Sequence, residues 1–138
     1  MKKSTQELLS LIQNAKNIEL YLKENETEMQ IWTLDKYLQH LMIEKQMKIA
    51  DVMNKSQQSD YVYKVFKNQR KASRDILIAI ALGMACSLDE TQTLLRIASQ
   101  ARLDPRNQRD AVFIYAVLHN LTVVEVNEIL YDLDVHGL

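Results

Sequence analysis

Residues Arg74–Glu90, with the sequence RDILIAIALGMACSLDE, decide the fold class of this 138-residue chain. The unbroken apolar run at residues 76–82 predicts a helix that is buried on most of its surface. Ser87 and Glu90 then form the pattern of a capping box, in which each side chain bonds to the other residue's backbone at a helix start. Two helices joined by so short a connection predict an αα-hairpin.

The same pattern returns 35 residues later in the chain. Residues 109–117 align with residues 74–82, and Thr122 and Glu125 repeat the capping box. Asp104-Pro105 is a typical helix start, with the acid as the cap and proline at the first helical position. We therefore expect a second αα-hairpin that begins at this point.

The composition supports a purely helical chain. Only two glycines and one proline occur in 138 residues, whereas sheets need turns that favour both residue types. One cysteine excludes an internal disulfide, and three widely separated histidines offer no metal-ligand spacing. No apolar run approaches the ~18 residues that span a bilayer, and no signal-peptide core is present. We expect an all-α, cytoplasmic protein without a metal or cofactor.

Residues 1–30 are expected to form an N-terminal helix and a linker. Ser4 and Glu7 form a capping box, and the apolar residues that follow recur at spacings of three and four. This stripe covers about two heptads, so packing onto the rest of the chain and dimerisation are both open. The dimerisation candidates are Leu8, Leu11, Ala15, Ile18 and Leu22.

Residues 31–100 have the outline of a helix-turn-helix domain. Trp32 precedes a helix capped by Thr33 and is placed to contact Tyr37, so we assign Trp32 to the core. A short helix follows at residues 47–53, and Ser56 or Ser59 then caps the next helix. The side chains of that helix that we assign to the core are Val62, Tyr63, Val65 and Phe66.

The net charge of −1 hides an uneven distribution along the chain. Residues 44–74 carry eight basic and three acidic groups, for a charge of +5, whereas residues 75–138 carry −5 and residues 1–43 carry −1. A local basic face can attract nucleic acid even when the whole protein is neutral. A solvated basic face without a partner is the alternative interpretation.

Residues 48–95 resemble the lambda-repressor-like helix-turn-helix domains of the Cro/repressor (XRE) regulators. The most specific match is Ala81–Glu90, which is similar to the segment that closes those domains, and Ala50 matches the alanine of the first motif helix. The whole chain also looks like helix-turn-helix proteins of Gram-positive bacteria. Asn68 stands where the family has a loop glycine. The resemblance implies a helix-turn-helix bundle at 31–100 with the N-terminal helix and an additional αα-hairpin at 101–138 packed on it.

The resemblance also implies sequence-specific binding of double-stranded DNA, as a homodimer that regulates transcription. In this binding mode the second motif helix enters the major groove, where glutamine can pair with adenine and lysine with guanine. By position, the candidates for base contact are Gln58, Ser59, Tyr61 and Lys64. The candidates for phosphate contact are Lys55, Lys67, Asn68, Gln69, Arg70 and Lys71.

Two other classes of function compete with the DNA-binding hypothesis. A helix-turn-helix scaffold that has lost DNA binding could serve as a protein-interaction module, with a partner for the N-terminal helix or for the acidic C-terminal hairpins. An enzyme is disfavoured because Cys86 has no histidine near it in sequence and no glycine-rich phosphate loop is present. We assign Cys86 to the core, and His40 with Glu44 to an exposed helical pair.

Overall fold

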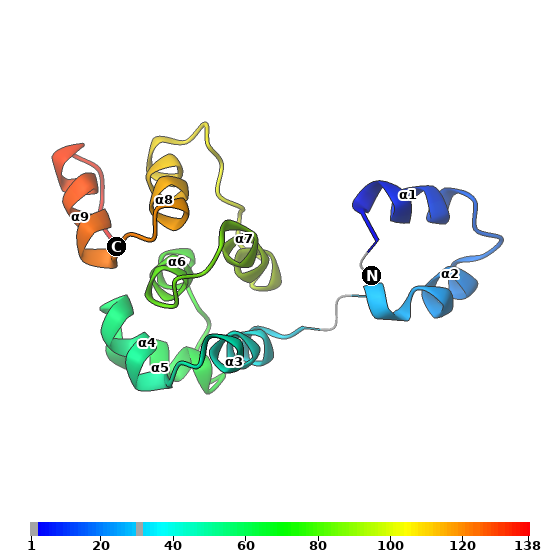
Figure 1. Ribbon diagram of the computed structural model, residues 1–138, viewed down its shortest axis with the longest axis horizontal. Coiled ribbons are helices and arrows are strands. Elements are labelled where there is room, and N and C mark those ends of the chain that lie inside the picture. The colour runs from blue at the N-terminus through cyan, green and yellow to red at the C-terminus, as the bar shows by residue number, and fades with distance from the viewer. Residues whose placement is uncertain (1–2, 30–31) are drawn as a thin grey trace. The chain divides into compact units, whose positions relative to one another are not determined.

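The computed structural model describes residues 3–29 and 32–138 and, within them, contains nine α-helices and one short 3-10 helix. No strand occurs in this described part, so the predicted all-α class is confirmed. The chain divides into an N-terminal unit, residues 1–31, and a C-terminal unit, residues 32–138 (Figure 1). None of the described helices is long and apolar enough to span a membrane.

The N-terminal unit is a helical hairpin, and the expected single helix through Leu22 is wrong. Helix α1 (Thr5–Gln13) starts at the predicted Ser4 cap, α2 (Ile18–Glu24) follows, and a 3-10 turn (Glu26–Glu28) ends the unit. The break occurs because the Asn17 side chain caps α2, accepting a hydrogen bond from the Leu20 amide at 2.7 Å. Asparagine at a helix start satisfies amides that have no partner within the helix.

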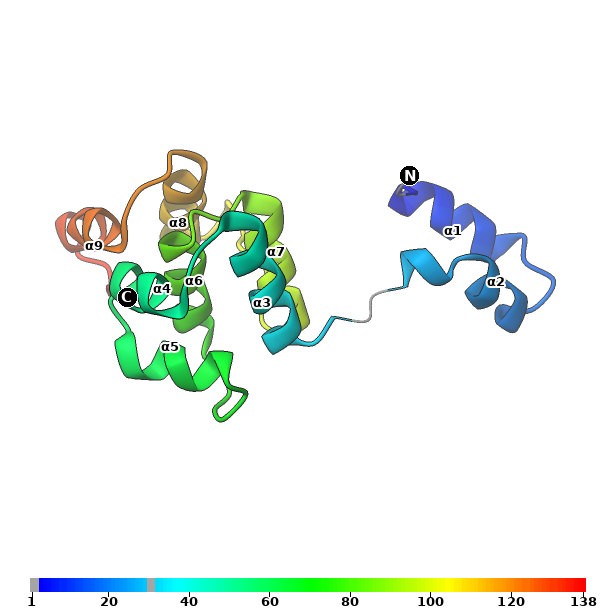
Figure 2. The ribbon, with the colours of Figure 1, turned by 60° about the horizontal axis from the view of Figure 1, so that its bottom comes forward.

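The C-terminal unit is built around one buried helix. In chain order its helices are α3 (Leu34–Lys45), α4 (Ile49–Ser56), α5 (Ser59–Phe66), α6 (Arg74–Gly83), α7 (Leu88–Ile97), α8 (Gln108–Leu118) and α9 (Val123–Asp132). Helix α6 is buried from Ile76 to Gly83. It contacts α4, α5, α7, α8 and α9, and Figures 1 and 2 show it in the middle of these helices.

The two predicted hairpins form, as α6–α7 and α8–α9. Both capping boxes are present, at Ser87 with Glu90 and at Thr122 with Glu125. The expected start of the second hairpin at Asp104-Pro105 is wrong, because Asn107 is the cap of α8 and accepts a hydrogen bond from the Asp110 amide at 2.9 Å. Asp104 instead accepts from the Arg106 amide in the preceding turn.

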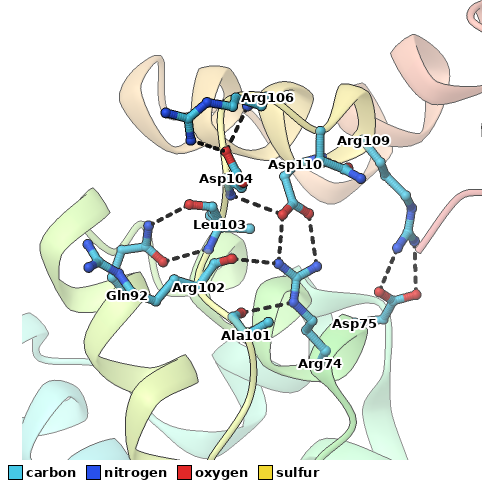
Figure 3. Close-up of polar contacts among 11 residues, drawn as sticks. Arg74, Asp75, Gln92, Ala101, Arg102, Leu103, Asp104, Arg106, Arg109 and Asp110 are labelled. Carbon is cyan, nitrogen blue, oxygen red and sulfur yellow. Dashed lines mark hydrogen bonds and ion pairs between the residues drawn. The ribbon is translucent and has the colours of Figure 1, made fainter.

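Two ion pairs join the starts of α6 and α8 (Figure 3). The Arg74 guanidinium donates two hydrogen bonds of 2.8 Å to the Asp110 carboxylate. Arg109 donates two bonds of 2.8 and 2.9 Å to Asp75. Paired donors of this kind match the planar geometry of a carboxylate and fix the relative orientation of the two helices.

Trp32 contacts Tyr37 as expected, with ring centroids 5.6 Å apart. The assignment of Trp32 to the core is wrong, because 41% of the residue is exposed. The ring covers the first turn of α3 from outside, in the manner of a hydrophobic staple.

Candidate nucleic-acid interface

Helices α4 and α5 are joined by a two-residue turn, Gln57 and Gln58. Gln57 has φ 61°, in the left-handed region that most often holds glycine at a helix end. Its side-chain amide donates to the Asn54 carbonyl at 3.0 Å, which helps to hold this conformation. The chain therefore passes from α4 into α5 through a short turn of defined conformation.

The backbone of α4 lies directly against α6 at Gly83. A Cβ atom at Gly83 would lie 3.0 Å from the Ser56 amide nitrogen and 3.3 Å from the Lys55 carbonyl carbon. A larger residue at position 83 would therefore press on the α4 backbone, and glycine gives α4 room to lie this close to α6. Ser56 is fully buried, and its hydroxyl donates to the Met53 carbonyl, so the contact leaves no buried hydroxyl without a partner.

Helix α5 is fixed by three buried side chains. Val62, Val65 and Phe66 are each at most 2% exposed, which confirms their assignment to the core. Because Val65 and Phe66 lie three and four positions after Val62, the three side chains occupy one face of the helix. Of the α5 side chains that the structure describes, those left exposed are Asp60, Tyr63 and Lys64.

The four residues predicted for base contact differ in how accessible they are. Lys64 is exposed, and Gln58 is half-buried at the start of α5. Tyr61 is half-buried, and its hydroxyl donates to the Lys71 carbonyl at 2.8 Å, so it holds the loop that follows α5. Ser59 is the first residue of α5, and its side chain lies outside the described part of the structure.

The assignment of Tyr63 to the core is wrong, because the residue is 44% exposed. Tyr63 and its neighbour Lys64 are both exposed on α5. The Lys67 ammonium lies 5.7 Å from the Tyr63 ring centroid. Sequence reasoning missed Tyr63 as a functional candidate. An exposed aromatic ring beside lysines is a typical feature of surfaces that bind nucleic acid.

The loop at 67–71 is anchored to the end of α5 by its own backbone. The Gln69 amide donates to the Lys64 carbonyl at 2.8 Å, and the Asn68 amide donates to the Val65 carbonyl at 3.1 Å. Asn68 has φ 56°, so these bonds form a Schellman motif with asparagine at the usual glycine position. The loop therefore leaves α5 in a defined direction.

All five residues of this loop, 67–71, are exposed, and three of them are basic. Together with Lys64 they form the basic surface, defined here as Lys64, Lys67, Arg70 and Lys71. None of these four side chains takes part in an ion pair among the described residues. The Arg70 guanidinium lies 4.7 Å from the Tyr61 ring centroid, which stacks it on an aromatic ring.

Lys55, the remaining predicted phosphate contact, lies apart from the basic surface. It is exposed in the last turn of α4, before the turn that leads into α5. The loop at 67–71 follows the opposite end of α5. The structure therefore brings five of the six predicted phosphate contacts together in one loop, at 67–71, and places Lys55 at the other end of the helix.

The residues predicted for dimerisation lie on two helices and the turn between them. Leu8 and Ala15 are half-buried, whereas Leu11, Ile18 and Leu22 are exposed. Among the described residues of this unit, those that are buried are Tyr21 and Asn25, which the apolar spacing did not indicate. The Lys3 ammonium donates to the Asn25 side chain, and the Asn25 amide donates to the Tyr21 carbonyl at 2.9 Å.

Cys86 and His40 lie in surroundings that give them structural roles. Cys86 is buried as expected, and burial raises the pKa of its thiol to about 12, so it carries no thiolate near neutral pH. His40 and Glu44 form the expected pair on α3, at 3.1 Å. Within the described residues no group of three or more His, Cys, Asp or Glu side chains is placed to hold a metal ion.

Comparison of this chain with known protein families, with curated proteins and with solved structures finds no match.

Proposed function

We propose that this protein is a sequence-specific DNA-binding transcriptional regulator, in which α4 and α5 act as a helix-turn-helix of the lambda-repressor-like kind. The observation that carries the proposal is the basic surface at the end of α5. Four exposed cations project from a helix end and a loop that the Schellman motif fixes, while the opposite face of α5 is buried. A cationic surface on a rigid element is what phosphate contacts require.

In the proposed complex α5 enters the major groove and the loop at 67–71 lies along the phosphate backbone. Gln58, in the turn before α5, and Lys64 of α5 remain available for base edges. Tyr63 joins them as an exposed neighbour, and Tyr61 acts by holding the loop through Lys71. Asp60, exposed in the first turn of α5, would disfavour a phosphate near it and accept a hydrogen bond from a cytosine amino group.

Fluorescence anisotropy of labelled duplex DNA, over a series of salt concentrations, tests the proposal. The two duplexes are the DNA upstream of the protein's own gene and a random sequence of the same length. We expect tighter binding to the upstream DNA. For Lys67→Ala/Arg70→Ala we expect weaker binding to both duplexes and a log-log salt slope smaller by roughly 1.8, since each phosphate contact contributes about 0.9.

Arg106→Ala is the control for a lost positive charge. Arg106 is exposed between α7 and α8, with its guanidinium 3.6 Å from Asp104, and its loss should leave both affinity and salt slope unchanged. Absence of binding to either duplex at low salt would overturn the proposal. A loss of binding free energy in the control half as large as that in the double variant would assign the binding to net charge alone, since the control removes one positive charge and the double variant removes two.

A second candidate function is a protein-interaction module, and exposed apolar side chains on the last two helices favour it. On α8, Tyr115 and Leu118 are 52% and 60% exposed, and on α9 Tyr131 is 84% exposed. Tyr115 and Leu118 lie three positions apart and therefore on one side of α8, and neighbouring large apolar side chains on a surface are typical of protein interfaces. This candidate predicts no anisotropy change with either duplex and partner binding that is insensitive to the Lys67→Ala/Arg70→Ala substitution.

A further inference from the structure

A cleft opens between the loop at 67–71 and the end of α7. Its volume is about 620 Å³, within the roughly 300–1,000 Å³ that is typical of small-molecule sites. Its walls come from the start of α3, from the end of α5 with the loop that follows, and from the end of α7. We call it the α5–α7 cleft, and its lining consists of residues 34, 65, 68–72 and 97–100.

The floor of the α5–α7 cleft is apolar and belongs to the core. Val65 and Ala72 are buried, and Leu34, Ile97 and Ala98 are half-buried and pack against the core cluster. Burial of apolar surface supplies much of the free energy with which small molecules bind. A ligand that fits this cleft therefore has an apolar part.

The rim of the α5–α7 cleft is cationic. Arg70 and Lys71 line the cleft and are exposed, and neither forms an ion pair among the described residues. None of the lining residues that the structure describes is acidic. Amide and hydroxyl side chains complete the lining: Asn68, Gln69, Ser99 and Gln100. Free cations beside neutral hydrogen-bond donors match a carboxylate or a phosphate group.

Both walls of the α5–α7 cleft have a fixed backbone. The loop at 67–71 is held by the Schellman motif that ends α5, and α7 ends in the same way. The Gln100 amide donates to the Leu95 carbonyl at 2.8 Å, the Ser99 amide donates to the Arg96 carbonyl at 3.0 Å, and Ser99 has φ 58°. The cleft is therefore largely preformed, as most small-molecule sites are.

The two helix ends at the α5–α7 cleft determine how a ligand would be oriented. The C-terminal end of a helix carries a partial negative charge, so the ends of α5 and α7 disfavour an anionic group deep in the cleft. Arg70 and Lys71 favour an anionic group at the rim. The apolar part of the ligand would then lie on the floor.

We propose that the α5–α7 cleft binds a small organic anion, with a carboxylate or phosphate group on Arg70 and Lys71 and an apolar part on the floor. These two cations are also among those proposed to contact DNA phosphates, so the bound anion would compete with DNA for them. The cleft would then be an effector site at which a metabolite of this chemical class releases the protein from DNA. That consequence rests on the proposed function, whereas binding of the anion does not.

Amide NMR spectroscopy of the full-length chain, with octanoate added below its micelle-forming concentration, tests the proposal. We expect saturable shifts of the signals from residues 68–72 and 97–100, with a Kd on the order of 0.1–1 mM for so small a ligand. Octanol lacks the charge and acetate lacks the apolar chain, so each should bind at least about tenfold more weakly. Octyl phosphate is the second anion, and the tighter of the two anions identifies the group that the cleft accepts.

Two variants separate the rim from the floor. Arg70→Gln/Lys71→Gln removes the two cations at exposed positions and should weaken octanoate binding at least about tenfold. Ala98→Leu places a larger side chain in the cleft without a change of charge and should abolish the saturable shifts. Lys48→Gln/Arg106→Gln is the matched control for charge, since both residues are exposed and neither lines the cleft, and it should bind octanoate as the wild type does.

Three results would overturn the proposal. Shifts centred on α1 and α2 would assign octanoate to the exposed aliphatic side chains of the N-terminal unit. Octanoate binding that either cleft variant retains in full would exclude the cleft. Equal affinities for octanol and octanoate would show that the cations at the rim take no part.

The effect on DNA binding is measured separately, by fluorescence anisotropy. Octanoate should weaken duplex binding by the wild type but not by Ala98→Leu, whose basic surface is intact. Octanoate that binds without any effect on DNA binding would overturn the competition. A wild-type chain that binds no DNA would overturn the proposed function, while the NMR titration still decides whether the cleft binds the anion.

Discussion

The hairpins α6–α7 and α8–α9 are held by the same set of contacts, shifted by 35 residues. In each hairpin the first arginine donates to two backbone carbonyls at the end of the same hairpin, at distances between 2.8 and 3.1 Å. These bonds run from Arg74 to Ala101 and Arg102, and from Arg109 to His136 and Gly137. A side-chain amide also repeats, with Gln92 accepting from the Leu103 amide and Asn127 from the Leu138 amide. The structure thus extends the repeat well beyond the residues that are alike in sequence.

The contacts between the two hairpins are reciprocal. Arg74 of the first hairpin pairs with Asp110 of the second, and Arg109 of the second pairs with Asp75 of the first (Figure 3). Likewise α6 contacts α9, and α7 contacts α8. Each of these contacts occurs twice with the roles exchanged, as in a two-fold interface between identical subunits.

The surroundings of the two hairpins differ, although their internal contacts agree. Ile80 of α6 is fully buried, whereas Tyr115 at the equivalent position of α8 is 52% exposed. Gly83 touches the backbone of α4, whereas its equivalent Leu118 is 60% exposed. One hairpin design thus serves as a central element at α6–α7 and as an outer layer at α8–α9, and the residue at the helix end decides whether another helix can approach.

The largest expected effect comes from removing one arginine of the reciprocal pairs. Arg74→Ala should lower the free energy of unfolding by about 3–5 kcal/mol, because it leaves a buried carboxylate without its partner. Arg109→Ala should cost about 1 kcal/mol, because the Asp75 side chain is 36% exposed and that of Asp110 is 8% exposed. Urea unfolding of both variants measures the difference, and equal losses would show that the two pairs are equivalent.

The pH dependence of stability reports on the same buried pair. Burial alone raises the pKa of Asp110, but the bonds from Arg74 and the Asp104 amide outweigh burial and bring the pKa below its usual value. A carboxyl with a lowered pKa stabilises the fold above its unfolded pKa, near 4, and this contribution is lost as the pH falls through the folded pKa. Wild-type stability should therefore fall below about pH 4, and Asp110→Asn should flatten that fall.

An intermediate effect is expected at the helix ends that distinguish the two hairpins. Gly83→Leu gives α6 the residue that α8 has, and it should cost about 1–3 kcal/mol because the new side chain meets the α4 backbone. Leu118→Ala should change stability by no more than about 0.5 kcal/mol, since nothing packs tightly on that exposed position. Thermal unfolding of both variants tests the comparison, and a tolerated leucine at position 83 would contradict the close approach of α4.

The sequence predicted the hairpins because their signals are local. Apolar spacing and capping boxes need only neighbouring residues, so Ser87 with Glu90 and Thr122 with Glu125 could be identified without a structure. The carbonyl contacts of Arg74 and Arg109 could not, because every residue has a backbone carbonyl and nothing in the sequence distinguishes those that are used.

The N-terminal break was missed because the apolar spacing continues across it. Leu8, Leu11, Ala15 and Ile18 keep spacings of three and four although the helix ends at Gln13. The available signal was Asn17, a preferred helix cap placed within the apparent stripe. Capping residues inside a periodic pattern therefore carry more weight than the pattern itself.

At the candidate site, periodicity could identify the buried face of α5 but not the roles of its two tyrosines. Tyr61 and Tyr63 flank Val62, each turned by about 100° from it around the helix. Their equal spacing leaves both at the edge of the buried face. The long-range bond from Tyr61 to the Lys71 carbonyl decides which of them is held and which is exposed.

The smallest expected effects are at the capping boxes that the two hairpins share. Ser87→Ala and Thr122→Ala should each lower the free energy of unfolding by about 1 kcal/mol, the usual value for a lost helix cap. The hydroxyls accept from the Glu90 and Glu125 amides at 3.1 and 3.2 Å, so the lost bonds are nearly the same. Equal losses in urea unfolding would show that caps act locally, whatever covers the hairpin. A larger loss at Ser87 would indicate that burial amplifies the cap, because Glu90 also pairs with Lys45 of α3 at 3.0 Å.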